Sequence, residues 1–401
     1  MIAIKNKKDC CGCHACATVC AKHCIAMQTD EEGFLYPVVD KDTCTDCGLC
    51  EKVCPVINQS EPRKPLKVYA AKNKNEEIRR QSSSGGIFTL LAEKIIGEGG
   101  VVFGARFDEA WNVVHSWTDT IEGIAAFRGS KYVQSTIGCT YKEAKRFLLQ
   151  GRKVLFSGTP CQIAGLKKYL CKDYDNLLAI DVVCHGVSSP LVWRRYLNDV
   201  RGTFPSQCSI TDISFRDKRN GWKKYAFCLR YDISKVTSNL SSTSKVEGEF
   251  LQPFTENIFM KGFLRNIYLR PSCYACVARS GKSGSDISIA DFWGVQNFYP
   301  EFDDDKGIGL ILINSDKGEE VYKGLGSLNV LATYEQGVAN NPSIEHSVVA
   351  PQQRNLFVFN SRQKLNEQLT PLIQSMRPNV MLRMFRDFRI KLGKIKRMIL
   401  K

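Results

Sequence analysis

The middle of the chain alternates between short apolar runs and longer amphipathic stretches. Two of these stretches, 87–95 and 140–150, repeat their apolar residues at helical spacing, and a third helix is predicted after the run at 153–156. The apolar runs have the length and composition of buried strands and lie at residues 67–71, 101–105, 153–156, 177–183, 285–292 and 309–314. Strands that alternate with helices predict an α/β sheet whose chemistry lies in the loops at the carboxyl ends of its strands.

The two ends of the chain depart from this pattern. Residues 58–66 contain two prolines and predict a linker, and residues 234–248 are polar and rich in Ser and Thr, which predicts a surface excursion. From 381 to 400, apolar residues recur at helical spacing opposite Arg and Lys, which predicts a basic amphipathic helix. The predicted units are 1–60, 67–148, 149–345 and a basic helical tail over 346–401.

The net charge of +15 is unevenly distributed. The first 60 residues carry six Lys against eight Asp and Glu, whereas residues 377–401 carry nine Arg and Lys against one Asp. The tail therefore predicts attraction to an anionic membrane surface or an acidic partner, and packing on its own domain is an equally good interpretation. The chain has no run of 18 apolar residues and no hydrophobic signal peptide, so a cytoplasmic protein is predicted.

Eight of the 18 cysteines form two copies of the spacing Cys-x2-Cys-x2-Cys-x3-Cys, which lie 34 residues apart. This spacing is typical of two-cluster 4Fe–4S ferredoxins, in which the fourth cysteine of each run binds the other cluster. Three thiolates wrap around one cluster, and the fourth points away because a helix has begun. The predicted ligands are Cys10, Cys13, Cys16 and Cys54 for one cluster and Cys44, Cys47, Cys50 and Cys20 for the other.

Zinc and disulfide bonds are the competing interpretations of these thiols. Zinc ribbons use two separated Cys-x2-Cys pairs and rarely a third cysteine at this spacing, and disulfides are disfavoured in a reducing compartment. The repeat also distinguishes two adjacent cysteines, because the 34-residue offset maps Cys10, and not Cys11, onto Cys44. Cys24 has no counterpart in the second run and is predicted to be a packed thiol without a ligand role.

Outside these runs, several motifs follow one another in a recognisable order. They are Ser82-Ser-Ser-Gly-Gly86, Gly129-Ser-Lys-Tyr-Val-Gln-Ser135, Gly158-Thr-Pro-Cys-Gln-Ile-Ala-Gly165, Cys184-His-Gly186, Cys273-x2-Cys276 and Ala290-Asp-Phe-Trp-Gly294. With these motifs, residues 1–315 resemble the coenzyme F420 hydrogenase/dehydrogenase beta-subunit family, including relatives with an N-terminal two-cluster ferredoxin module.

The resemblance implies an α+β ferredoxin-like dicluster module followed by an α/β flavin-binding domain. It also implies bound FAD and a third 4Fe–4S cluster. Scattered thiols are by themselves more often core residues than ligands, but the resemblance makes four of them the expected ligands of the third cluster: Cys161, Cys184, Cys273 and Cys276. The remaining thiols match no motif and are predicted to be packing residues: Cys139, Cys171, Cys208 and Cys228.

No G-x-G-x-x-G fingerprint is present, so FAD is expected at other loops. The serines of the first motif are predicted to cap a helix, and its backbone N–H groups and hydroxyls suit a phosphate; without the resemblance, a flexible loop is the simpler interpretation. The run Gly281-Lys-Ser283 lacks the first glycine of a P-loop. The residues expected to bind the cofactor are Ser82, Ser83, Ser84, Gly85, Gly86, Gly129, Ser130, Lys131, Tyr132, Gly158, Thr159 and Pro160.

The function implied is an oxidoreductase that passes electrons from a low-potential donor through the clusters to FAD and on to an organic acceptor, or in the reverse direction. The expected partners are an acidic donor such as ferredoxin, or a partner redox protein, and a small-molecule acceptor; no nucleic acid is expected. His185 is the candidate catalytic residue, as a proton donor near the flavin, or else it caps a loop. The competing hypotheses are an electron-transfer adaptor without its own substrate site and a scaffold whose clusters only stabilise the fold.

Overall fold

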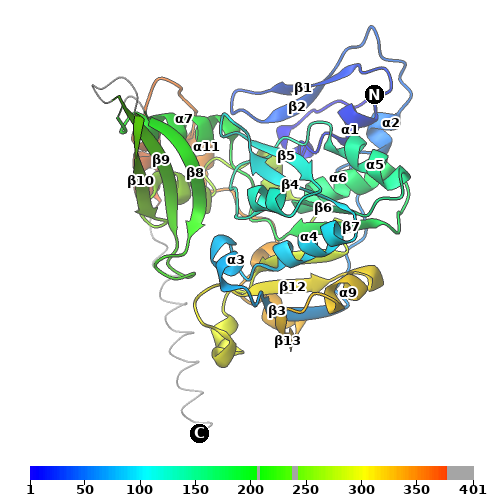
Figure 1. Cartoon of the computed structure of the whole chain (residues 1–401). Coiled ribbons are helices and arrows are strands. Elements are labelled where there is room, and N and C mark those ends of the chain that lie inside the picture. The colour runs from blue at the N-terminus through cyan, green and yellow to red at the C-terminus, as the bar shows by residue number, and fades with distance from the viewer. Residues whose placement is uncertain (206–207, 237–242, 377–401) are drawn as a thin grey trace, which may run out of the picture.

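The computed structural model describes residues 1–205, 208–236 and 243–376. Three bodies pack against one another: an N-terminal cysteine-rich module, a central sheet with helices on both faces, and a smaller antiparallel sheet beside it (Figure 1). Within the described ranges, no helix is long and apolar enough to span a lipid bilayer.

The N-terminal module is built around its own cysteines. Its elements are α1 (Ala15–Val19), the antiparallel pair β1 (Ile25–Thr29) and β2 (Leu35–Val39), and α2 (Leu49–Lys52). The buried cluster of the module contains four thiols together with Ile2 and Ile25: Cys16, Cys24, Cys50 and Cys54. Thiols therefore take the place that large aliphatic side chains take in an ordinary small domain.

The central sheet has eight strands in the order β13-β3-β12-β11-β7-β6-β4-β5. The neighbours β4, β6, β7 and β11 are parallel, and the pairs toward both edges are antiparallel. The bounds are β3 (Lys67–Lys72), β4 (Val101–Phe107), β5 (Val113–Thr118), β6 (Val154–Gly158), β7 (Leu177–Val182), β11 (Ile287–Asp291), β12 (Gly309–Ile313) and β13 (Leu328–Ala332). The parallel strands bring the loops after β6 and β7 to one edge, where sites form in such sheets.

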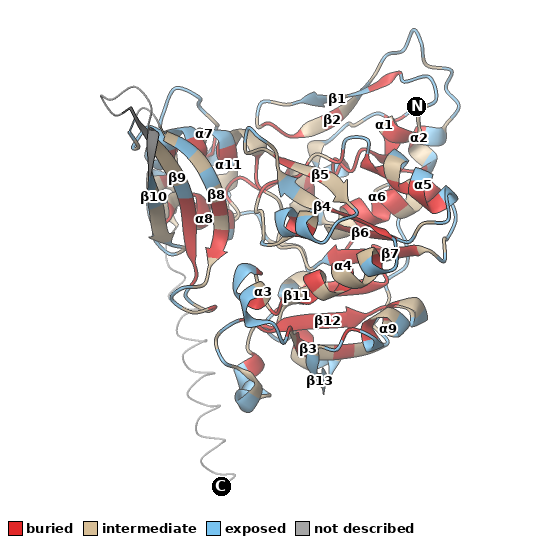
Figure 2. Cartoon of the chain, in the orientation of Figure 1, coloured by how far each residue is buried: buried red, intermediate tan, exposed pale blue. Residues whose placement is uncertain are grey.

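Helices cover both faces of this sheet, so its inner strands are mostly buried (Figure 2). The edge strand β13 carries the exposed side chains of Leu328 and Leu331. Alternate residues point to opposite faces: Phe103 and Phe156 pack with one helix pair, and Val102 and Leu155 pack with helix α4. The helices around the sheet are α3 (Glu76–Gln81), α4 (Ile87–Gly97), α5 (Thr140–Leu149), α6 (Pro160–Leu170), α9 (Asp316–Lys323) and α10 (Tyr334–Val338). Helix α6 also contacts α1, which seats the N-terminal module against the sheet.

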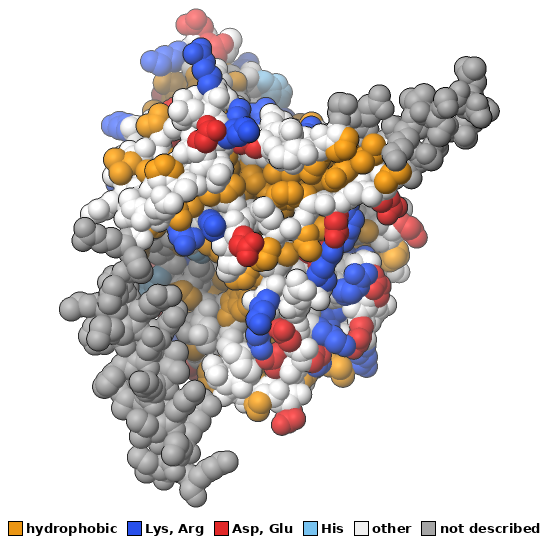
Figure 3. All heavy atoms as spheres, turned by 90° about the vertical axis from the view of Figure 1, so that its left-hand side faces the viewer, with side chains coloured by type: hydrophobic (Ala, Val, Ile, Leu, Met, Phe, Trp, Pro, Cys, Tyr) orange, Lys and Arg blue, Asp and Glu red, His pale blue; other side chains and the backbone are white. Residues whose placement is uncertain are grey.

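The smaller sheet has three antiparallel strands, β8 (Cys208–Asp217), β9 (Ala226–Val236) and β10 (Thr243–Pro253). Its core joins Trp193, Phe227, Phe259 and Leu369 from the sheet and from the helices packed on it. These helices are α7 (Pro190–Arg201), α8 (Ile258–Leu264) and α12 (Leu365–Ser375), with α11 (Gln352–Leu356) beside α12. Figure 3 shows a band of hydrophobic side chains across the side of the molecule that carries this sheet.

All the strands and helices predicted in the middle of the chain are present, with ends shifted by at most two residues. Within the surface excursion predicted at 234–248, β9 continues to Val236 and β10 starts at Thr243, so these parts are strands, which were not predicted; residues 237–242 lie outside the described residues. One face of an antiparallel ribbon lies in solvent and is polar, so its sequence resembles that of a loop. Of the predicted tail, 352–375 contains α11 and α12; α12 packs into the core of the smaller sheet and α11 contacts α12. The basic helix predicted at 381–400 lies outside the described residues.

Candidate metal and cofactor sites

The internal repeat of the cysteine runs appears in the backbone. Gly12 and Asp46 have φ values of 69° and 47°, and His14 and Gly48 have values of 64° and 73°. Each pair is separated by the 34-residue offset of the repeat. Because equivalent positions share a left-handed conformation that non-glycine residues rarely adopt, both runs turn the chain in the same way before α1 and α2 begin.

The first run surrounds a small cavity, which we call the first thiol cavity. Its lining includes Cys54 from the second run together with thiols of the first: Cys10, Cys11, Cys13 and Cys16. Burial, together with the neighbouring Cys10, Cys54 and Cys50 thiols, raises the pKa of Cys16 to about 12. The structure thus brings together the set in which the fourth cysteine comes from the opposite run.

The second predicted set lies nearer the surface. Cys50 is buried, Cys20 and Cys44 are half-buried, and Cys47 is exposed. Cys24 is buried, and its Sγ lies 3.3 Å from the Sγ of Cys20. The Cys20 thiol raises the pKa of Cys24 to about 12. Cys24 therefore touches a predicted ligand, although the repeat gives it no counterpart.

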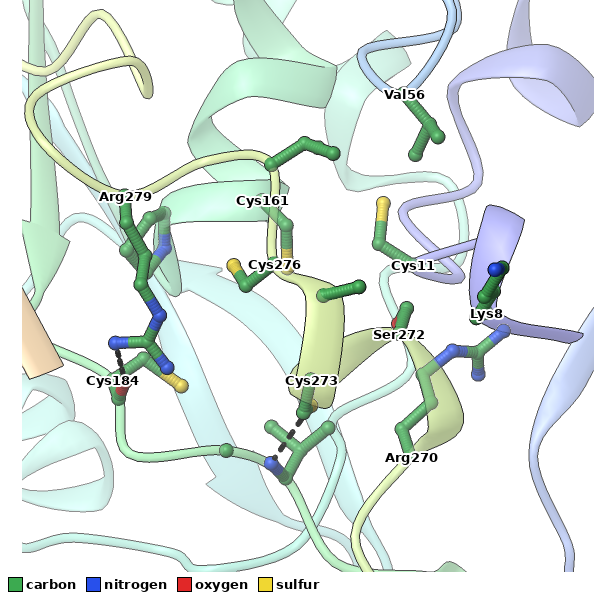
Figure 4. A pocket seen from close by; sticks show the side chains of 15 residues that line it. Lys8, Cys11, Val56, Cys161, Cys184, Arg270, Ser272, Cys273, Cys276 and Arg279 are labelled. Atoms are coloured by element: carbon green, nitrogen blue, oxygen red, sulfur yellow. Dashed lines mark hydrogen bonds between the residues drawn. The ribbon is translucent and has the colours of Figure 1, made fainter. Parts of the chain in front are cut away.

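The four scattered thiols meet at another cavity, the third thiol cavity (Figure 4). Cys161 lies in the first turn of α6, Cys184 follows β7, and Cys273 lies in the short helix η3 (Pro271–Ala275), which ends at Cys276. A fifth thiol, Cys11, lines this cavity as well as the first thiol cavity. The 34-residue offset excluded Cys11 from the predicted ligands of the first run, but the sequence did not predict that Cys11 lies between two sites.

The thiols of the third cavity perturb one another. A hydrogen bond to Cys11 and burial raise the pKa of Cys161 well above its ordinary range. Burial raises the pKa of Cys273 to about 12 and also raises the pKa of Cys184 and Cys276. Such thiols ionise only beside a positive charge, which ligated iron supplies.

Within the part of the chain that the structure describes, no group of three or more Cys, His, Asp or Glu is placed to hold a single metal ion. A four-iron cluster bonds each thiolate to a different iron, so its ligands stand farther apart than those of one tetrahedral zinc ion. Metal analysis of the purified protein distinguishes the zinc interpretation from the cluster interpretation of these thiols.

Two of the four thiols predicted as packing residues are exposed, so that prediction is wrong for Cys139 and Cys171. Cys139 is the N-cap of α5, and Cys171 ends α6 with a φ of 61°. Both lie at helix ends, which solvent reaches. Cys228 is fully buried, as predicted, and Cys208 is half-buried.

A cavity of about 650 Å³ lies at the carboxyl edge of β6 and β7; we call it the large cavity. It is lined by all the expected cofactor-binding residues except Pro160, which lines the third thiol cavity instead. Cys184 lines both, so the large cavity and the third thiol cavity share a wall. Loops that are far apart in the sequence therefore meet around one space.

The serine motif forms one end of the large cavity, but not in the predicted way. The N-cap of α4 is Gly86, with a φ of 76° and no side-chain cap, so the prediction that the serines cap this helix is wrong. Ser83 Oγ instead accepts from Ser130 N at 2.6 Å and lies 2.8 Å from Ser130 Oγ, while Ser84 Oγ donates to Ile308 O at 2.6 Å. The N-terminus of α4 thus faces the cavity without a side-chain cap, an arrangement that favours anions.

Two histidines line the large cavity. His185 lies with Nε2 2.6 Å from Asn266 Oδ1, and burial lowers its pKa. His115 was not predicted; its Nε2 lies 3.0 Å from the carbonyl oxygen of Ser157, and burial lowers its pKa to about 4. Its Nδ1 is buried and has no hydrogen-bond partner among the described residues. Since a carbonyl only accepts, the proton of His115 is on Nε2, and Nδ1 carries a lone pair.

An aromatic wall, which the sequence did not predict, closes another side of the large cavity. Trp293 and Tyr225 line the cavity, and the Arg216 guanidinium lies 5.1 Å from the Trp293 ring and 4.4 Å from the Tyr225 ring. The buried Trp222 ring stacks on Trp293 at 4.6 Å and supports it. Arg216 Nη1 also donates to Asp291 Oδ2 at 2.6 Å. Asp291 and Trp293 belong to a motif of the sequence resemblance to which no role had been given. The wall offers flat surfaces and a positive charge.

Comparison with known proteins gives three matching family models. Two describe the beta subunit of coenzyme F420 hydrogenase/dehydrogenase: the model of its C-terminal part matches residues 151–335, and the model of its N-terminal part matches residues 68–138. A 4Fe-4S dicluster domain model matches residues 9–58. Together the three models account for the cysteine runs and for most of the central and smaller sheets.

Individual relatives are distant. A subunit of the F(420)H(2) dehydrogenase of Methanosarcina mazei is 22% identical over 170 residues, which is 38% of this chain and 46% of that protein. The match therefore spans about half the length of that relative. A chain of the xenon-derivatised F420-reducing NiFe hydrogenase complex from Methanosarcina barkeri is similar over 78% of this chain and 91% of its own length, with 18% identity and a TM-score of 0.43.

Proposed function

The chain belongs to the coenzyme F420 hydrogenase/dehydrogenase beta-subunit family of electron-transferring oxidoreductases and carries a 4Fe–4S dicluster domain, and on this premise we propose that it is an iron–sulfur flavoprotein. In this proposal the three thiol sets hold three 4Fe–4S clusters and the large cavity holds FAD. The bound groups supply one-electron transfer and its coupling to a two-electron organic acceptor. The direction of transfer follows from the partners.

The main support for this proposal is that the first thiol cavity, the third thiol cavity and the large cavity lie one after another, and that each neighbouring pair shares a lining residue. Cys11 lines both the first and the third thiol cavities, and Cys184 lines both the third thiol cavity and the large cavity. A scaffold whose clusters only stabilise the fold has no need of this sequence of adjoining sites. Cys47 is exposed, which supports the proposal that a partner redox protein exchanges electrons with the second thiol set.

The residues of the large cavity fit FAD. A cavity of about 650 Å³ lies within the range of about 300–1,000 Å³ usual for small-molecule sites. The uncapped start of α4, the paired hydroxyls of Ser83 and Ser130, and Lys131 suit a pyrophosphate. His115 and His185 line the same cavity, and burial lowers the pKa of both, so both are neutral at pH 7.

Anaerobic reconstitution tests the proposal directly. We expect about twelve irons per chain and one FAD, with flavin reduced through the clusters by a chemical donor. A product with about eight irons and no flavin would mean that only the dicluster domain binds a cofactor, and it would reject the proposal. Turnover of a small acceptor by the isolated chain separates an enzyme from an adaptor that only relays electrons to a partner.

FAD affinity is expected to depend on pH through Lys131. Its Nζ donates to the carbonyl oxygens of Arg128 at 2.8 Å and Ala126 at 3.0 Å, and burial lowers its pKa from 10.5 to about 7. A bound phosphate favours the protonated form, so binding takes up a proton above pH 7, and affinity falls as pH rises by up to about tenfold per unit. Fluorescence titrations with FAD between pH 6.5 and 8.5 measure this slope.

The Lys131→Arg variant is the control, because arginine stays charged over this range. Its FAD affinity should be nearly independent of pH. An equally steep slope in Lys131→Arg would assign the effect to another group.

A further inference from the structure

Arg270 is a deeply buried cation with no acidic partner. Its side chain is 1% exposed. Nε donates to Cys10 O at 2.8 Å, Nη1 to Gln134 Oε1 at 2.8 Å, and Nη2 to Leu35 O at 2.9 Å, with Cys10 Sγ at 3.6 Å from Nη2. The Tyr36 ring lies 4.3 Å from the guanidinium. Within the described ranges no carboxylate lies in ion-pair reach of Arg270.

The position of Arg270 links two of the thiol sites. It directly precedes η3, which carries Cys273, and its side chain reaches across to the loop of the first run (Figure 4). Gln134 continues this contact by donating from Nε2 to Cys11 O at 3.1 Å. Gly12 has a φ of 69°, and a Cβ there would lie 2.8 Å from Arg270 Nη1. The guanidinium thus rests against the backbone between two cysteines of the first run.

Electrostatics indicate what balances this charge. An unpaired buried cation is costly, and neutral carbonyls and rings compensate it only in part. The thiol in contact with the guanidinium is Cys10 Sγ of the first thiol cavity, at 3.6 Å, and ligation by iron would keep it ionised. Arg270 also lines the third thiol cavity, so its charge acts on the thiols there as well. Adding an electron to a cluster in the first thiol cavity adds negative charge beside Arg270, which favours the reduced state.

We propose that Arg270 is a positioning residue of the first centre: it raises the reduction potential of that cluster and fixes the Cys10–Cys11–Gly12 backbone against the third thiol cavity. If both centres were loaded, electron transfer between them would oxidise one by one electron and reduce the other by one, and the fixed backbone would hold their separation constant for this step. The inference depends on the proposed third cluster only for electron transfer between the first and third centres. It does not depend on the flavin.

The test is a redox titration of the reconstituted protein followed by low-temperature electron paramagnetic resonance. Arg270→Gln should keep its iron, yet shift the potential of one dicluster centre to a more negative value by about 59 mV, which is a tenfold change for one electron. Arg270→Lys keeps the charge and should restore most of the potential. Arg279→Gln is the matched control, because Arg279 is also buried but donates to the carbonyl oxygen of Cys184 at 2.9 Å, so the dicluster signals should not move.

Unchanged potentials in a fully loaded Arg270→Gln protein would overturn the proposal. If this variant fails to take up iron, wild-type protein labelled with arginine-¹⁵N tests the contact between Arg270 and the cluster instead. Pulsed resonance should show a ¹⁵N coupling in one reduced dicluster centre, and its absence rejects the contact. Both readouts work with flavin absent, so failure of the proposed function through missing FAD is distinguishable from failure of this inference.

Discussion

Replacing Cys273 by serine is expected to remove about four of about twelve irons and to disconnect the flavin from the dicluster. Cys273 is buried against the other thiols of its cavity, and its Sγ accepts from Val187 N at 3.5 Å. Serine is nearly the same size as cysteine but is a poor ligand for iron, so the fold is expected to be retained while the third cluster is lost. Reduced dicluster should then no longer reduce the flavin on the timescale of the wild-type reaction.

Iron analysis, flavin content and stopped-flow absorbance measure the three parts of this prediction. Cys139→Ser is the matched control, because this thiol is exposed, and it should change none of them. Parallel Cys11→Ser and Cys184→Ser variants identify which thiols of the five ligate, since only loss of a ligand lowers the iron content. A Cys273→Ser protein that keeps all its iron and its rate of flavin reduction would contradict the assignment of the third site.

Introducing a carboxylate at Ser83 is expected to abolish FAD binding while leaving the clusters in place. Ser83 lines the large cavity beside the uncapped N-terminus of α4 and contacts Ser130. An aspartate there occupies the anion site and repels the pyrophosphate. Two charges 4 Å apart at a protein surface interact by about 4 kcal/mol, so a loss of FAD affinity of at least about a hundredfold is expected.

Ser83→Asn provides the neutral control of the same size. It should weaken FAD binding by about tenfold, which corresponds to about one hydrogen bond. Equilibrium titration with FAD gives both affinities, and iron analysis verifies that the dicluster remains loaded. Equal FAD affinity in Ser83→Asp and Ser83→Asn would mean that the phosphates lie elsewhere in the cavity.

Features with local physical causes were predictable from the sequence. The inner strands of the central sheet are continuous apolar runs because both of their faces are buried, and this pattern can be recognised in a single sequence. The edge strands β5 and β13 are only partly buried and were not predicted. The polar ribbon of β9 and β10 was missed because one of its faces lies in solvent. The serines of the first motif were predicted to bind the cofactor, and they line the large cavity. Their contacts were not predicted, because the hydrogen bond of Ser83 goes to Ser130 and not to its own helix.

The sequence by itself determined that this protein carries two cysteine runs suited to two clusters and an α/β sheet with reactive loops, because spacing along the chain decides both. Only the tertiary structure decided that Cys11 and Cys184 are shared between neighbouring cavities and that Arg270 lies buried beside Cys10. These contacts join segments that are distant in sequence, and the packing of the N-terminal module on α6 and η3 sets them. The cost of an unpaired charge likewise appears only after packing has removed water from around it.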